Sequence, residues 1–138
     1  MSARFVVDNS VVMSWCFEDE ASAETDAIAD EVRSDGAIVP ELFHLEIANI
    51  LLQAERKGRL TAAGVAARLN LLGELAITTD PETSRRAWHD GLSLARAHRL
   101  TSYDAAYLEL ALRTGSGLAT RDGALANAAR ALGIALRP

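Results

Sequence analysis

The 138-residue chain is poor in cysteine and proline, with one Cys and three Pro. Cys16 cannot form a disulfide within the chain, and it lies in an apolar run, which predicts a buried, unreactive thiol. No Ser-, Gly- or Pro-rich stretch divides the sequence, so we expect neither a linker nor a disordered segment. The length suits one core, and we therefore expect a single domain over residues 1–138.

Long apolar runs are also missing. No segment approaches the roughly 18 uncharged apolar residues of a membrane span, and the first apolar stretch is interrupted by Asp8 and lacks the features of a signal peptide. These absences predict a soluble, cytoplasmic protein without a membrane partner.

Lysine is scarce as well, since Lys57 is the only one among 14 basic residues, and 19 acidic residues give a formal net charge of −5. This balance argues against a protein that coats nucleic acid by neutralising phosphates. It is compatible with a metal-dependent nuclease, because a divalent cation needs a concentrated negative site.

Short apolar runs alternate with longer segments of helical periodicity. The predicted strands span residues 5–7, 37–39, 76–78, 117–119 and 134–136. The predicted helices span residues 11–17, 21–33, 41–57, 62–74, 81–98, 102–113 and 123–132. Strands that alternate with helices predict an α/β fold in which helices cover both faces of a parallel sheet.

Two aspartates directly follow predicted strands. Asp8 closes the first strand and Asp122 follows the fourth, so both fall at the carboxyl ends of strands, where open parallel sheets carry their sites. Each residue also fits a plain N-cap of the helix that comes next. Position alone leaves both interpretations open.

Two further acidic residues lie on predicted inward faces of helices. Glu46 falls between Phe43 and Ile50 on an apolar stripe, and a buried carboxylate must protonate, pair with a cation or bind a metal. The structural alternative for Glu46 is an ion pair with an arginine at the rim of the core. Asp104 lies in line with Tyr107, but its segment also fits a helix-capping box.

The alternatives for the single residues do not explain why all four carboxylates converge. In a parallel α/β sheet, strand ends and the adjoining helix termini gather at one edge, and all four residues map there. Without a cation, their repulsion would raise their pKa values and destabilise the fold. Oxygen ligands without nitrogen or sulfur suit Mg²⁺ or Mn²⁺. We therefore predict a divalent metal site at this edge.

Four segments, in their order and spacing, resemble the motifs of the PIN-domain family, specifically the VapC-type toxins of bacterial toxin–antitoxin pairs. These segments are residues 7–11 (VDNSV), 40–49 (PELFHLEIAN), 102–107 (SYDAAY) and 119–122 (ATRD). The resemblance runs nearly end to end. It implies a three-layer α/β/α fold with a parallel sheet of order 3-2-1-4-5, flanked by about seven helices.

The resemblance also implies an activity and its partners. The chain would be an Mg²⁺- or Mn²⁺-dependent endoribonuclease that hydrolyses RNA phosphodiesters. It would act as a toxin that is inhibited by a cognate antitoxin, whose basic tail enters the same site. A homodimer is implied too, and the apolar surplus of residues 41–74 is a plausible interface.

Roles for individual residues follow from the same resemblance. The catalytic and metal-binding residues would be Asp8, Glu46, Asp104 and Asp122. Ser10 and Thr120 would be polar neighbours that orient ligands or water. Asn9 departs from the small residue often found at its position, which leaves its part open.

Two other classes of function are alternatives to this interpretation. A haloacid-dehalogenase phosphatase needs Asp-x-Asp after the first strand, where this chain has Asp8-Asn9-Ser10, and a response-regulator receiver needs a lysine near its last strand. Both fit poorly. The second rival, a non-catalytic module whose acidic pocket binds an arginine-bearing partner, stays open.

Overall fold

A parallel sheet organises residues 5–137, the part of the chain that the computed structural model describes. Its strands are β1 (Phe5–Val7), β2 (Ala37–Val39), β3 (Ile77–Thr79), β4 (Gly117–Ala119) and β5 (Leu136–Arg137). They lie in the order β3-β2-β1-β4-β5, and every pairing is parallel. The predicted strand order is confirmed.

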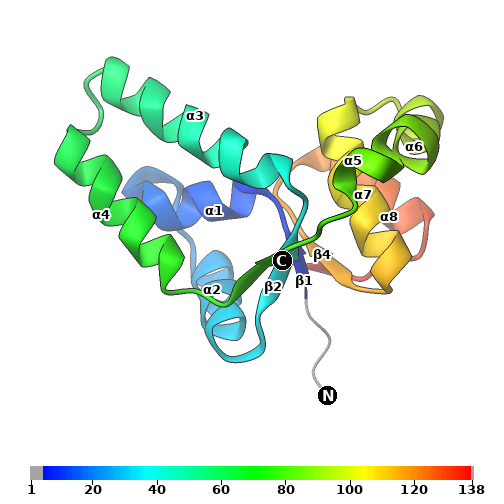
Figure 1. The fold of residues 1–138 in the computed structure, drawn as a ribbon. Helices are drawn as coiled ribbons and strands as arrows, with labels where there is room; N and C mark the ends of the chain where they lie inside the picture. Colours follow the sequence, from blue (N-terminus) through cyan, green and yellow to red (C-terminus); the bar gives the residue numbers. More distant parts are fainter. Residues whose placement is uncertain (1–4, 138) are drawn as a thin grey trace.

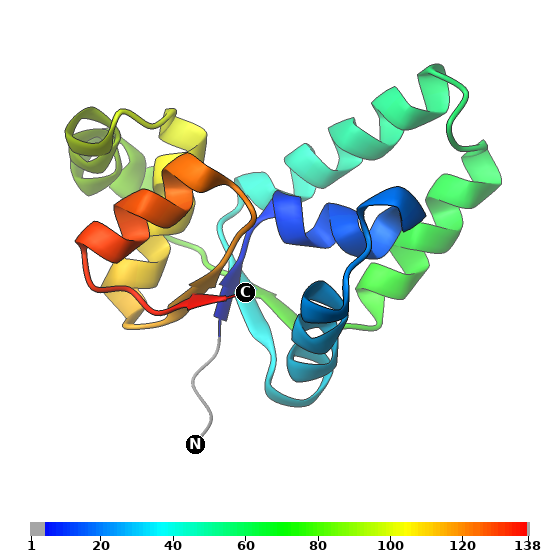
Figure 2. The ribbon, with the colours of Figure 1, turned by 180° about the vertical axis from the view of Figure 1, so that it is seen from behind.

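Helices cover both faces of this sheet. They are α1 (Asn9–Cys16), α2 (Ala23–Asp35), α3 (Leu42–Arg56), α4 (Ala62–Gly73), α5 (Thr83–Arg86), α6 (Leu92–His98), α7 (Ser102–Thr114) and α8 (Gly123–Ala131). In Figure 1, α1 to α4 lie on one side of the sheet and α5 to α8 on the other, and Figure 2 shows the same layers from behind. The predicted three-layer α/β/α architecture is confirmed.

The predicted helix 81–98 forms with an irregular centre. It begins at Thr83, and a turn of π-helix, η2 (Ala87–Gly91), lies between α5 and α6. A short 3₁₀ turn, η1 (Glu18–Glu20), was not predicted.

Two predicted strands begin too early. Ile77 donates its N–H to the carbonyl of Leu75, and this tight turn delays β3 from 76 to 77. Ile134 lies in the turn that closes the carboxyl end of α8, because its N–H bonds to the carbonyl of Ala129 and Gly133 adopts a left-handed conformation. Strand β5 therefore starts at Leu136.

Two predicted helices shift because of their caps. Ser22 accepts a hydrogen bond from the N–H of Thr25, which starts α2 at Ala23 rather than at residue 21. Asp8 caps α1, which therefore begins at Asn9 rather than at residue 11.

The core fixes the edge at which the strands end. Val6, Val7 and Leu118 are fully buried in the central strands, and α7 packs over β1 and β4. Among residues 5–137, no helix is long and apolar enough to cross a membrane. The carboxyl ends of β1 and β4, together with the first turns of α7, thus meet at one edge of the sheet.

Candidate active site

Asp8 is held at the carboxyl end of β1 by its neighbour in the sheet. Val7 pairs with Ala119, and the N–H of Asp8 donates to the carbonyl of Ala119 at 3.1 Å. This register sets Asp8 beside Thr120, whose hydroxyl donates to Asp8 Oδ2 at 2.5 Å. The Ser10 hydroxyl donates to Asp8 Oδ1 at 2.6 Å. The carboxylate is 4% exposed, and burial raises its pKa although these hydrogen bonds act in the opposite direction.

Asp122 follows β4 and caps α8. Its Oδ1 accepts from the N–H of Leu125 at 2.9 Å, while its own N–H donates to Thr120 Oγ1 at 3.0 Å. Thr120 therefore joins Asp8 and Asp122. The predicted capping role is real for both aspartates. For Asp122 the role is compatible with a further one, because capping engages only its Oδ1.

Glu46 reaches the same edge from α3. Its Oε1 accepts a hydrogen bond from the Tyr107 hydroxyl at 2.5 Å. Burial and the Glu46 carboxylate both raise the pKa of Tyr107, so its hydroxyl stays a donor. Within residues 5–137 Glu46 forms no ion pair, so the alternative of an arginine partner is not observed.

Asp104 lies in the first turn of α7, which Thr101 caps by accepting the N–H of Asp104 at 3.1 Å. Burial raises the pKa of Asp104, and the charges of Asp122 and Glu46 raise it further. Asp104, Asp122 and Glu46 are thus close enough for their charges to interact.

Another acidic residue at this edge, Asp80, was missed by sequence reasoning. It follows β3 and is buried, but Arg113 Nη2 lies 2.8 Å from its Oδ2. Arg113 also pairs with Glu82 at 3.3 Å and with Glu109 at 2.9 Å. By contrast, in the described part of the chain none of the four predicted site carboxylates pairs with an arginine or lysine. Charge at the sheet edge is therefore neutralised at Asp80 and left free at Asp8, Glu46, Asp104 and Asp122.

Arg121 is a second residue that sequence reasoning missed. Its guanidinium donates to Ser14 Oγ at 2.6 Å and to the carbonyl of Glu20 at 2.7 Å, and its N–H donates to Ser10 Oγ at 2.8 Å. These bonds tie the loop that carries Asp122 to α1 and η1. No local pattern in the sequence indicates them, because the partners lie about a hundred positions away. The side chain of Asn9, whose role stays a prediction, makes no hydrogen bond within residues 5–137.

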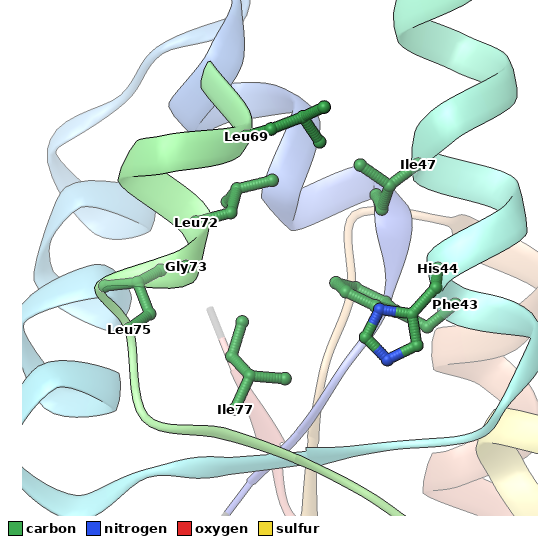
Figure 3. Close-up of a pocket in the computed structure, with 8 residues that line it drawn as sticks. All are labelled: Phe43, His44, Ile47, Leu69, Leu72, Gly73, Leu75 and Ile77. Carbon is green, nitrogen blue, oxygen red and sulfur yellow. The ribbon is translucent and has the colours of Figure 1, made fainter. Parts of the chain in front are cut away.

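An apolar hollow lies between α3, α4 and β3 (Figure 3). It is lined by Phe43, His44, Ile47, Leu69, Leu72, Gly73, Leu75 and Ile77. At its rim, His44 Nε2 lies 2.7 Å from Thr79 Oγ1. The hollow offers almost no charged group and is a surface for apolar contact rather than for chemistry.

The donor chemistry of the acidic edge fits a hard divalent cation. All four unpaired groups are carboxylates, the ligands that Mg²⁺ and Mn²⁺ prefer. The raised pKa values of Asp8 and Asp104 mark charges that a cation would stabilise. Over residues 5–137, no three acidic, His or Cys side chains converge into a ready-made coordination site. A cation would therefore have to draw the carboxylates together.

Comparisons with known proteins agree with this geometry. The PIN domain family profile matches residues 5–131. Ribonuclease VapC3 of Pyrobaculum aerophilum is 29% identical over 123 residues, which cover 89% of this chain and 92% of that protein. The crystal structure of PAE2754 from Pyrobaculum aerophilum superposes with a TM-score of 0.68 at 25% identity, covering 93% of this chain and 87% of the other. The predicted resemblance to VapC-type proteins is confirmed, and the chain belongs to the PIN-domain family.

Proposed function

We propose that this protein is a divalent-metal-dependent endoribonuclease with a site formed by Asp8, Glu46, Asp104 and Asp122. The observation that carries the proposal is the contrast at the sheet edge: Asp80 is neutralised by Arg113, whereas these four carboxylates have no cationic partner within residues 5–137. Family membership and the ribonuclease name of the relative support the choice of RNA.

The residues of the site have three kinds of role in this proposal. Asp8 and Asp104 would be the principal ligands of Mg²⁺ or Mn²⁺, with Glu46 and Asp122 completing the negative site. When bound, the ion would polarise the scissile phosphate and lower the pKa of water. Ser10 and Thr120 fix the Asp8 carboxylate by donating to its two different oxygens. They would keep it in one orientation as substrate enters.

Cleavage of total RNA by the purified protein tests the proposal. Discrete cuts are expected with Mg²⁺ or Mn²⁺, and they should disappear with EDTA and in Asp8→Ala. Asp35→Ala is the matched control, since Asp35 is exposed at the far end of α2. Absence of metal-dependent cutting by protein free of any bound inhibitor would favour a non-catalytic module that captures an arginine-bearing partner.

Divalent cations should also stabilise the fold. At 100 times its Kd, Mn²⁺ is expected to add about 2.7 kcal/mol to the free energy of unfolding. Because the pKa values of Asp8 and Asp104 are raised, these groups become protonated earlier than ordinary aspartates as pH falls. A protonated carboxylate binds metal poorly, so the shift of the thermal midpoint should be large at neutral pH and shrink as the pH falls through the raised pKa values of these two groups. A shift that stays the same as the pH falls would contradict the assignment of these ligands.

We also propose that the protein is the toxin of a toxin–antitoxin pair, acts in the cytoplasm and is inhibited by a cognate antitoxin. The named VapC relative supports this role. A basic segment of the antitoxin would form ion pairs with the four carboxylates at the sheet edge. Nuclease activity that appears only after the partner has been removed by denaturation and refolding would be in line with this regulation.

A homodimer through α3 and α4 is part of the proposal. Helix α4 is rich in apolar residues, yet none of its residues is buried, and Leu71 is 60% exposed. Such an apolar face is expected to be covered by a partner. Sedimentation should show a dimer that Leu71→Glu converts to a monomer. Leu112→Glu, at an exposed position on α7, should leave the dimer intact; the opposite pattern would place the interface on the other side of the sheet.

A further inference from the structure

One direct hydrogen bond joins α3 to α7 across the acidic edge. The Tyr107 hydroxyl donates to Glu46 Oε1 at 2.5 Å, and the Tyr107 side chain is fully buried. The ring is locked in the core beneath the site, so the hydroxyl is a fixed donor. Glu46, by contrast, is half-buried on α3 and carries a long side chain with considerable rotamer freedom to lose.

The donor to Glu46 is a neutral hydroxyl group and not a cation. An arginine at the same place would fix Glu46 but would also cancel its negative charge, as Arg113 does for Asp80. The neutral tyrosine hydroxyl holds the carboxylate while leaving its charge available to a cation. Tyr107 therefore resembles Ser10 and Thr120, which hold Asp8 through neutral hydroxyl groups.

Tyr107 belongs to the same helix as Asp104. It lies three residues after Asp104 on α7, on the same side of the helix. One turn of α7 thus supplies Asp104 to the site and also supplies the group that anchors Glu46. Both carboxylates are thereby tied to the same helix, Asp104 through the backbone and Glu46 through one hydrogen bond.

We propose that Tyr107 is a positioning residue, whose hydroxyl fixes Glu46 relative to Asp104 so that both carboxylates can hold one divalent cation. The inference rests on the proposed metal-dependent function and deepens it. Residues that hydrogen-bond to metal ligands orient them, and removal of such a residue typically lowers metal affinity or activity by about 10- to 100-fold.

The test compares Tyr107→Phe with Tyr103→Phe, which removes a hydroxyl from an exposed tyrosine on the same helix. Mn²⁺ affinity is measured by electron paramagnetic resonance, and kcat and KM are measured on a defined RNA. Tyr107→Phe should weaken Mn²⁺ binding by about 10- to 100-fold and lower kcat with little change in KM. Tyr103→Phe should leave Mn²⁺ affinity unchanged.

A double-mutant cycle with Glu46→Gln shows whether Tyr107 acts through Glu46. In the Glu46→Gln background, Tyr107→Phe should cause little further loss of Mn²⁺ affinity, because the two changes remove one shared interaction. Full additivity would overturn the proposal, as would unchanged Mn²⁺ binding in Tyr107→Phe or a variant that no longer folds. Failure of the wild-type protein to bind Mn²⁺ or cut RNA would instead reject the proposed function itself.

Discussion

Replacing Asp104 by Asn is expected to abolish RNA cleavage while leaving the fold intact. The substitution removes a charged oxygen ligand but retains the shape of the side chain and the N–H that Thr101 caps. Removal of a residue that only orients a metal ligand lowers metal affinity or activity by roughly 10- to 100-fold. Removal of the ligand itself should have a larger effect, so activity should fall by at least about 100-fold. Single-turnover cleavage at saturating Mn²⁺ measures the effect.

Stability should move in the opposite direction to activity in this variant. The pKa of Asp104 is raised in the folded protein. At pH values above that pKa, the charged carboxylate therefore lowers the free energy of unfolding. At low pH, where the group is protonated, this destabilisation is absent. In metal-free protein at neutral pH, Asp104→Asn should therefore match or exceed the thermal midpoint of the wild type. A collapse of the midpoint would mean that Asp104 serves chiefly the helix terminus. Full nuclease activity of Asp104→Asn would show that Asp104 is not part of the active site.

Replacing Arg113 by Met is expected to destabilise the protein by about 3–5 kcal/mol, because it leaves buried carboxylates without their cation. The side chains of Asp80 and Glu109 are each 6% exposed, and Arg113 is the cationic partner of both. Methionine fills much of the same volume, so the loss reports the unpaired charges rather than a cavity. A loss of this size is a large share of the 5–15 kcal/mol by which domains are usually stable.

Urea unfolding of Arg113→Met and Arg130→Met measures this cost. Arg130 is an exposed arginine on α8 that bonds only to Asn127 within the described residues, and its replacement should change the free energy of unfolding by less than about 0.5 kcal/mol. Equal, small losses in both variants would show that the Arg113 cluster contributes little and that charge neutralisation at Asp80 is not required.

The sheet was predictable because its signals are local. Apolar runs such as 37–39, bounded by Gly36 and Pro40, fix the strands, and the alternation with helices fixes their parallel pairing. Strand ends were less predictable, because the turn at Leu75 and the left-handed Gly133 shift them by one or two residues. Such shifts depend on hydrogen bonds that the pattern of apolar residues does not encode.

The candidate site was predictable in its residues but not in its connections. The position of Asp8 after a strand and of Glu46 on an apolar stripe predicted that both carboxylates belong to the site. Arginine was the structural alternative for a partner of Glu46, whereas the residue that bonds to it is Tyr107, 61 positions away along the chain. The pairing of Asp80 with Arg113 likewise spans 33 positions. Contacts at this range follow from the fold, and no single segment of sequence contains them.

Asp8, Glu46, Asp104 and Asp122 are proposed to form a divalent metal site. Crystals grown with Mn²⁺ test this proposal directly, because anomalous scattering locates the ion. We expect a peak at the carboxyl edge of the sheet, within about 2.0–2.2 Å of oxygens of Asp8 and Asp104, the range of first-row metal–oxygen bonds. A peak elsewhere, or none at Mn²⁺ concentrations that support cleavage, would contradict the proposal.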